Sequence, residues 1–257
     1  MYYHNHILRS QSEVYSAEAE AVFLLMPNPL TTTEKQNINT VVNAMVLSGN
    51  WAKMDYFFFN TLTDEANSLM CAIRGISASN VNGCVHTPNQ GFRGNGTTKY
   101  IDTNFNLATD SVNATLNINN IGAYCYDNFD VLTQNLFGSR AGLAFTGIVQ
   151  TGTSINYVNN AGTGAVYAPS NVFVKGRYST HRIDSVNSYY QENGVTVSSS
   201  TVSSYGIPAE TMGILAQKYT SITGHLDGTV SYAYYGGNLD RVALNNELNL
   251  LESLFIV

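Results

Sequence analysis

The chain has 257 residues and a net charge of −6, and only 12% of its residues are charged. Nucleic-acid binding depends on clustered Lys and Arg, so this acidic, sparsely charged composition argues against it. The longest apolar run, 21–26, falls far short of the roughly 20 residues that a membrane-spanning helix needs. The start of the chain lacks the basic-then-apolar order of a secretory signal, so we expect no export by that route.

Polar uncharged residues fill many of the positions that charged residues occupy in other proteins. Asn, Ser, Thr, Gly and 17 Tyr residues take the place of charged side chains. Tyr presents a rigid face with few rotamers to freeze, and Asn or Ser supply adaptable hydrogen bonds, so this composition suits contact with glycans or proteins. A β-rich particle protein without a ligand would have the same composition, and both interpretations stay open.

The first 75 residues are predicted to form an arm followed by helices. Residues 1–15 are polar and Tyr-rich and are predicted to form a terminal arm. Residues 16–26 hold strong helix formers up to Pro27, which disfavours the helical conformation in the residue before it. A second helix is predicted over 31–49, because apolar residues recur there at helical spacing, and a short third one over 63–74.

The only tryptophan, Trp51, follows the second predicted helix. A lone Trp between a helix and a strand is usually an anchor of the core, and its burial stabilises a fold by several kcal/mol. We therefore expect Trp51 to contribute to folding rather than to recognition.

From residue 91 onward the chain is predicted to be β-structure. The pair Asn95-Gly96 is a tight-turn signal, which predicts that the segments on either side fold back on one another. Residues 111–119 alternate apolar and polar, which predicts a strand with one wet face. A hairpin is predicted over 188–199 around Asn193-Gly194. Further strands are predicted at 143–150, 172–174, 178–186, 212–216 and 229–235.

These patterns predict a mainly β fold. Many short strands with Gly- and Asn-rich turns are typical of an antiparallel two-sheet jelly-roll sandwich rather than a parallel sheet. A short C-terminal helix is predicted to begin with Asn245 as its cap and to place Leu248, Leu251 and Phe255 against the fold. The predicted organisation is an arm (1–15), a helical attachment region (16–75) and the sandwich (76–257).

Three segments together resemble one known family. Residues 92–103 read F-x-G-N-G-T-x-x-Y-I-D-T, residues 49–55 read G-x-W-x-x-x-D, and Y-Y-G-G-N-L at 234–239 precedes L-N-N-E-L at 244–248. This combination resembles the LamG-like, concanavalin A-like jelly roll of bacteriophage tail, appendage and fibre proteins, including those of phages that infect gut Bacteroidetes. The resemblance covers roughly residues 30 to 255 of this sequence.

The resemblance implies a virion-associated binding or structural module without catalytic residues. It implies contact with other virion proteins through the N-terminal region, and a homo-oligomer, which by analogy with phage fibres is a trimer. A phage protein that is assembled in the cytoplasm and released by lysis needs no secretory signal.

Catalytic and metal-binding patterns are weak. Jelly-roll glucanases need two carboxylates about 5–5.5 Å apart on one strand face when they retain configuration, and no predicted strand supplies such a pair. The nearest acids, Asp127 and Asp130, lie three apart in a predicted loop. Calcium held in that loop is an alternative to a turn that bonds its own backbone, and no other cofactor is predicted.

Cysteine and histidine usage indicates structural roles. Cys71, Cys84 and Cys125 show no C-x-x-C spacing, so buried free thiols are expected, and a reducing assembly compartment disfavours a Cys71–Cys84 bridge. His181 lies in a predicted strand, where a structural role is expected.

One loop combines aromatic residues with Asn and Asp, and it is the predicted ligand-binding site. Aromatic faces can stack on the apolar faces of sugars while the polar side chains bind hydroxyls. Its residues are Tyr124, Tyr126, Asp127, Asn128, Phe129 and Asp130. We expect a virion structural protein whose lectin-like sandwich binds a host-surface glycan or protein. A purely structural virion subunit is the alternative, and a glycan-cleaving enzyme is a distant third.

Overall fold

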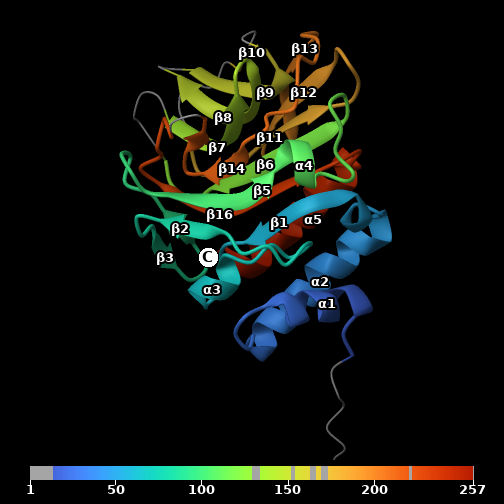
Figure 1. The fold of residues 1–257 in the computed structure, drawn as a ribbon. Helices are drawn as coiled ribbons and strands as arrows, with labels where there is room; N and C mark the ends of the chain where they lie inside the picture. The colour runs from blue at the N-terminus through green and yellow to red at the C-terminus, as the bar shows by residue number, and fades with distance from the viewer. Residues whose placement is uncertain are drawn as a thin grey trace, which may run out of the picture.

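The computed structural model describes residues 14–128, 134–151, 154–162, 166–168, 173–219 and 222–256. These residues form three layers: a layer of helices, a sheet that the helices cover, and a second sheet on the far side (Figure 1). We call the two sheets the helix-side sheet and the outer sheet. The predicted antiparallel two-sheet jelly-roll sandwich, with helices near both ends of the chain, is confirmed.

Each sheet has eight strands within the described part of the chain. The helix-side sheet runs in the order β13 (Val195–Ser200), β12 (Ser188–Glu192), β11 (Gly176–Arg182), β6 (Asn119–Cys125), β16 (Thr229–Gly236), β4 (Gly91–Arg93) and β3 (Val85–Thr87), with β1 (Met54–Phe59) also paired to β16. The outer sheet runs in the order β10 (Val166–Ala168), β9 (Ser154–Ala161), β8 (Ala144–Thr151), β7 (Gln134–Ala141), β14 (Thr211–Ile214), β5 (Tyr100–Asn106) and β2 (Ser79–Val81), with β15 (Gln217–Lys218) paired to β7.

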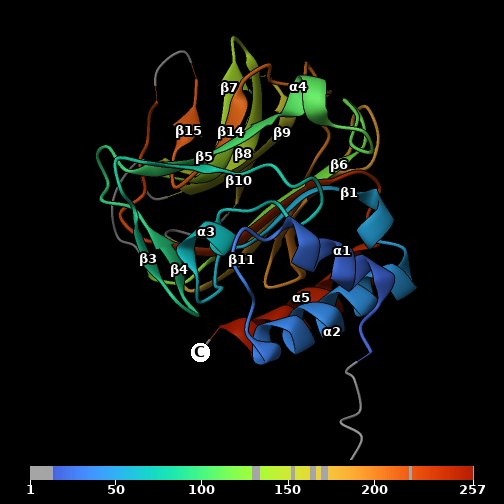
Figure 2. The same ribbon diagram turned by 60° about the horizontal axis from the view of Figure 1, so that its bottom comes forward.

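Three helices make the helix layer: α1 (Ala17–Leu25), α2 (Thr32–Ser48) and α5 (Arg241–Phe255). α2 packs against both α1 and α5 (Figure 2). The remaining helical segments are short: η1 (Trp51–Lys53), α3 (Glu65–Ser68) and α4 (Leu107–Asp110). No helix among the described residues is long and apolar enough to cross a membrane.

The first two predicted helices are confirmed, and their ends have clear causes. Ser16 caps α1 by accepting a hydrogen bond from the Ala19 backbone N–H. α2 begins with a capping box between Thr31 and Glu34, and it ends at Gly49, whose φ of 78° suits glycine.

Two apolar clusters hold the layers together. Between the sheets lie buried residues such as Phe58, Phe92 and Tyr157. Between the helix-side sheet and the helices lie Phe57, Leu248 and others. Strand β1 is buried along its whole length, because successive side chains point into one cluster and then the other. The predicted attachment region, 16–75, therefore supplies a strand to the sandwich.

Most of the predicted β-structure is present. The hairpin β12–β13 turns at Asn193 and Gly194, whose φ values are 50° and 78°, as a two-residue hairpin requires. Strands also occur within the predicted ranges 143–150, 178–186, 212–216 and 229–235. In the range 172–174, Phe173 and Val174 are not in a strand, and residue 172 lies outside the described residues.

The Asn95-Gly96 turn does not close a hairpin. It joins β4 of the helix-side sheet to β5 of the outer sheet, so the flanking strands belong to different layers. The Asn95 side chain accepts hydrogen bonds from the backbone N–H groups of residues 97, 98 and 99, which fixes the direction of this crossing.

The strand predicted over 111–119 is wrong. Only residue 119 lies in a strand, and Val112 is 72% exposed although the alternation predicted its burial. The backbone N–H groups of residues 112, 113 and 114 donate to the Asp55 carboxylate at 3.0, 2.9 and 2.7 Å. Successive N–H groups in a strand point in opposite directions, so a segment that turns three of them toward one carboxylate cannot be a strand.

Two helix predictions need correction. Over 63–74 the helix is confined to α3, and the chain then forms isolated bridges, Phe58 with Cys71 and Met70 with Ser77. The last helix begins at Arg241 rather than after Asn245, because Asp240 accepts hydrogen bonds from the first backbone N–H groups. The predicted packing of Leu248, Leu251 and Phe255 against the fold is confirmed.

Buried polar and sulfur-containing side chains are structural, as predicted. Cys71, Cys84 and Cys125 are buried free thiols. His181 is buried in β11, where its ring contacts the Ser179 hydroxyl at 3.0 Å and the Asn120 amide oxygen. Burial lowers the pKa of His181 to about 3, so the imidazole is neutral in the folded protein.

Removing the Asp55 charge should destabilise the fold. In Asp55→Asn, the amide N–H₂ group faces backbone donors, and Arg74 loses its buried counter-charge, so we expect a loss of about 3 kcal/mol in the free energy of unfolding. Chemical denaturation measures this. Asp227→Asn is the matched control, because that carboxylate is 51% exposed and should cost less than about 1 kcal/mol. Equal losses in the two variants would contradict the role of Asp55.

Acid should destabilise the fold through His181. A histidine with an unfolded pKa of 6.5 and a folded pKa of about 3 stabilises the fold fully above pH 6.5 and loses that stabilisation as the pH falls toward 3. We expect the free energy of unfolding to fall by about 2 kcal/mol between pH 6.5 and 5. In His181→Gln the fall should be clearly smaller. The same slope in both proteins would show that other groups cause the acid sensitivity.

Candidate functional site

The loop predicted to bind ligand follows strand β6. Its first aromatic residue, Tyr124, lies within β6 and is only 8% exposed. The ring packs on Tyr232 with centroids 5.7 Å apart, in the cluster beneath the helices. Tyr124 therefore stabilises the junction of sheet and helices and offers no face to a sugar.

The next residues of this loop reach the surface. Tyr126 is half-buried, and the Lys175 ammonium group lies 4.2 Å from its ring centroid. Asn128 is exposed and accepts a hydrogen bond from the Lys175 backbone N–H at 2.7 Å. Asp127 lies 3.8 Å from the Arg93 guanidinium. Phe129 and Asp130, the remaining predicted residues, lie outside the described residues. The alternative of calcium held between Asp127 and Asp130 therefore includes one residue that the structure does not describe.

A second candidate site lies where the helix layer meets the sandwich. It is a cleft of about 590 Å³ between α1, η1, the chain at 72–74 and the irregular segment at 112–113. We call it the Trp51 cleft. Its volume falls within the roughly 300–1,000 Å³ of small-molecule sites, and its walls are mainly apolar with a few polar groups, which is the usual composition of such sites.

Trp51 supplies the aromatic surface of this cleft. It is half-buried and packs against the cluster beneath the helices, as an anchor of the fold would, and it also lines the cleft. One part of the indole packs toward Phe57, with ring centroids 6.4 Å apart. An indole combines an apolar face with an N–H group at its edge, which suits a ligand that is both apolar and hydrogen-bonding.

Polar groups from two other segments line the same cleft. Arg74 donates through Nε to the Asp55 carbonyl at 3.2 Å and through Nη2 to the Asp55 carboxylate at 3.1 Å. Asn113 donates through its amide to the Met54 carbonyl at 3.2 Å. A guanidinium carries five N–H groups, and an amide oxygen accepts hydrogen bonds, so donors and an acceptor remain for a ligand. Both side chains are held in place by the buried Asp55 carboxylate.

Helix α1 forms the opposite wall. Glu18 and Ala21 are exposed there, and Leu25 is half-buried. These residues repeat at three- and four-residue spacing, so they occupy one face of the helix. The wall is therefore apolar with a single carboxylate at one end.

Groups that would perform chemistry are sparse around the cleft. Most glycoside hydrolases use two carboxyl groups, and among the described residues Glu18 is the one carboxylate that lines the cleft. Asp55 is fully buried, and both of its carboxylate oxygens accept hydrogen bonds from the protein. No group of His, Cys, Asp and Glu within the described ranges is placed to hold a metal ion. The arrangement is suited to binding.

Sequence reasoning singled out Trp51 and Asp55 as part of one motif but did not connect them to a cleft. Arg74 and Asn113 lie 19 and 58 residues from Asp55 along the chain, and no local pattern links them. The signal that could have been used is the unusual combination of a lone Trp with an Asp inside an otherwise apolar strand.

Comparisons with known proteins support the fold and leave the family open. No protein-family model matches the chain, and no curated protein matches it. Among solved structures, it resembles Trypanosoma rangeli sialidase in complex with sialic acid, with a TM-score of 0.57 and 13% identity, over 87% of this chain and 40% of the sialidase chain.

Two further solved structures are similar. Domain 4 of AbnA, a GH43 extracellular arabinanase from Geobacillus stearothermophilus in complex with arabinotriose, gives a TM-score of 0.53 and 10% identity over 76% of this chain and 98% of that domain. The receptor-binding domain of botulinum neurotoxin C/D mosaic serotype gives a TM-score of 0.55 and 11% identity, over 79% of this chain and 52% of that chain. The chain thus spans about 40% of the sialidase, and identities this low establish a shared β-sandwich fold alone.

Proposed function

We propose that this protein is a glycan-recognition module that binds saccharides in the Trp51 cleft without cleaving them. The observation that carries the proposal is the position of the only tryptophan. It lies half-buried on the wall of a cleft in which two polar side chains, Arg74 and Asn113, are fixed by one buried carboxylate.

A saccharide matches this cleft chemically. A pyranose or furanose ring has an apolar face of C–H groups and a rim of hydroxyls that both donate and accept hydrogen bonds. The indole suits the apolar face, while Arg74, Asn113 and Glu18 suit the hydroxyls. Because the Arg74 guanidinium and the Asn113 side-chain amide both already donate to the Asp55 carboxylate, binding loses little side-chain entropy at those two residues.

The similar structures support a saccharide over other small ligands. The arabinanase domain was solved with arabinotriose and the sialidase with sialic acid. Those ligands belong to those proteins, and a shared fold does not imply a shared function. They show that sugar complexes occur among proteins that contain this kind of sandwich, and the chemistry of the cleft is compatible with such a ligand.

The carboxylates described in the cleft favour binding without cleavage. Most glycosidases place two carboxyl groups on either side of the bond that breaks. Among the described residues that line the cleft, Glu18 is the one carboxylate, so a bound saccharide would meet one half of that machinery there.

Filling the cleft from helix α1 tests the proposal. Ala21 is exposed and lines the cleft, so Ala21→Trp should occupy the space of the ligand without disturbing the core. We expect saccharides that bind the wild-type protein on a glycan array to bind this variant at least about tenfold more weakly, equal to about 1.4 kcal/mol. Ala66→Trp is the matched control, since Ala66 is exposed on α3 and does not line the cleft.

The loop with Tyr126 and Asn128 is the competing site, and the same array separates the two. If Tyr126→Ala loses binding while Ala21→Trp keeps it, the saccharide binds in the loop and the Trp51 cleft proposal is wrong. If no saccharide binds in a multivalent format, glycan recognition fails altogether, and a purely structural role is favoured.

We also propose that this protein is a component of a virion, and this part of the proposal rests on the sequence resemblance alone. It includes contact with other virion proteins through the N-terminal region, a homo-oligomer that analogy with phage fibres makes a trimer, and a host-surface glycan as ligand. Deleting residues 1–15 should leave a folded sandwich that no longer joins particles, as measured by mass spectrometry of purified particles. Incorporation of the truncated protein at normal copy number would contradict the docking role.

A further inference from the structure

Helix α1 carries apolar side chains that the rest of the described structure does not bury. Successive residues of an α-helix are about 100° apart around its axis. Ala19 and Val22 face the core and are buried. Ala21 and Leu25 face the Trp51 cleft, while Leu24 points away from both and is 87% exposed. α1 also carries Glu18 and Glu20, but its apolar surface extends beyond the side that the fold buries, so this added apolar surface is expected to have a partner.

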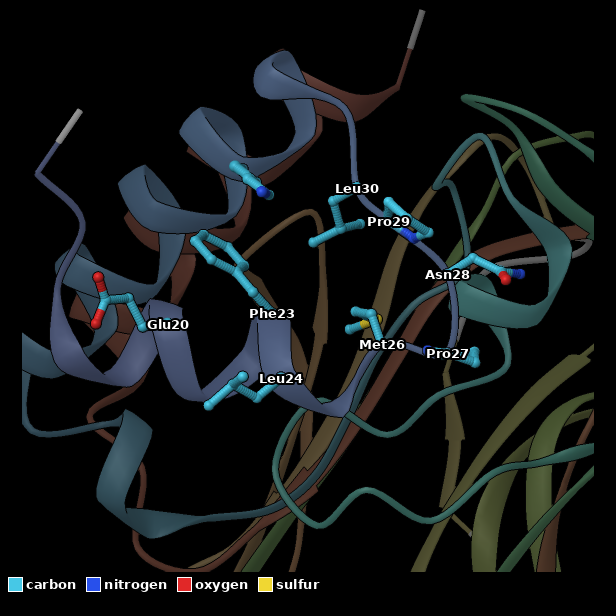
Figure 3. A pocket seen from close by; sticks show the side chains of 9 residues that line it. Glu20, Phe23, Leu24, Met26, Pro27, Asn28, Pro29 and Leu30 are labelled. Atoms are coloured by element: carbon cyan, nitrogen blue, oxygen red, sulfur yellow. The ribbon is translucent and has the colours of Figure 1, made fainter. Parts of the chain in front are cut away.

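A groove adjoins the exposed Leu24. It has a volume of about 580 Å³ and lies between α1, the connection at 26–30 and α2. We call it the α1 groove. Figure 3 shows Phe23 pointing from α1 toward the other helix, Leu30 on the connection beyond it, and Leu24 projecting from the opposite side of α1. The walls are mostly apolar, and charge occurs in two places: Glu20 on α1 and Lys35 on α2.

The two charged residues lie on different helices. The first turn of α1 is acidic, with Glu18 and Glu20, and its last turn holds no basic residue. Lys35 lies in the first turn of α2, with its ammonium group 5.9 Å from the Phe23 ring centroid. Among the described residues neither Glu20 nor Lys35 forms a salt bridge, although both line the groove.

We propose that the α1 groove binds α1 of a second copy of this chain, forming a symmetric homodimer rather than the trimer that analogy with phage fibres suggests. Residues 20–35 line an apolar groove and also supply the exposed Leu24, the acid Glu20 and the base Lys35. When both members of a complementary pair lie on the same patch, a two-fold axis satisfies both at once. Leu24 of each copy then enters the groove of the other, and Glu20 of each copy faces Lys35 of the other.

The dimer would leave the saccharide site accessible. The α1 groove and the Trp51 cleft lie on different faces of α1: Glu20, Phe23 and Leu24 line the groove, while Ala21 and Leu25 line the cleft. When a second copy occupies the groove, the Trp51 clefts of both copies in the dimer therefore remain open. If the proposed glycan binding holds, pairing adds avidity to weak single sites. The dimer itself does not depend on that function.

Sedimentation velocity of the full chain, from micromolar to several hundred micromolar, tests the dimer. The wild-type protein should shift from monomer to dimer with concentration. Leu24→Glu should raise the dimer dissociation constant at least about tenfold, because it places a charge in an apolar interface. Leu47→Glu is the matched control: Leu47 is 89% exposed on α2, does not line the groove, and should leave dimerisation unchanged.

A charge exchange identifies the partner as a second copy. Glu20→Lys alone and Lys35→Glu alone should each weaken the dimer, and the double variant should restore it, since the opposite charges then face each other again. Circular dichroism confirms that all variants stay folded. The proposal is overturned if the wild-type chain remains monomeric at the highest concentration, if Leu24→Glu and Leu47→Glu behave alike, or if the double variant is no better than the single ones.

Discussion

The buried Asp55 carboxylate is the constraint on which the junction of helices and sandwich depends. It accepts hydrogen bonds from three successive backbone N–H groups and from Arg74, and its side chain has no exposure to solvent. A carboxylate buried without such donors would destabilise the fold by several kcal/mol, so the segment at 112–114 and Arg74 must lie where they do. Two walls of the Trp51 cleft are therefore set by folding, before any ligand binds.

Two of the three sequence segments that carry the family resemblance, 49–55 and 234–248, meet at this junction. Asn50 donates to Glu247 at 3.0 Å and to the Asp240 carbonyl at 3.1 Å, which joins the end of α2 to α5. Gly237 packs so closely on the Asn113 backbone that a Cβ atom there would lie 2.5 Å from the Asn113 oxygen. Most residues of these segments therefore preserve the junction. Trp51 differs from the other residues of these segments, because it is half-buried and lines a cleft.

Features with local causes could be predicted from the sequence, and features with distant causes could not. The Asn193-Gly194 hairpin and the Thr31 cap follow from neighbouring residues, and both are present. The irregular path of 111–119 follows from Asp55, more than fifty residues away, which an alternating pattern cannot reveal. Tyr124 was predicted to bind ligand because it precedes an aromatic loop, yet its position in β6 directs it beneath the helices. Two possible caps, Asp240 and Asn245, precede the same apolar pattern; only Asp240 caps α5, and Asn245 contacts Arg177 instead.

Tryptophan fluorescence tests the central claim most directly, because Trp51 is the only tryptophan and lines the proposed site. The protein is titrated with a panel of neutral and acidic oligosaccharides, and both the emission wavelength and quenching by acrylamide are measured. The account predicts that at least one saccharide shifts the emission saturably and protects Trp51 from quenching, and that Ala21→Trp, studied by calorimetry because it adds a second indole, no longer binds that saccharide. A saccharide that binds by calorimetry while the emission and quenching of Trp51 stay unchanged would contradict the account.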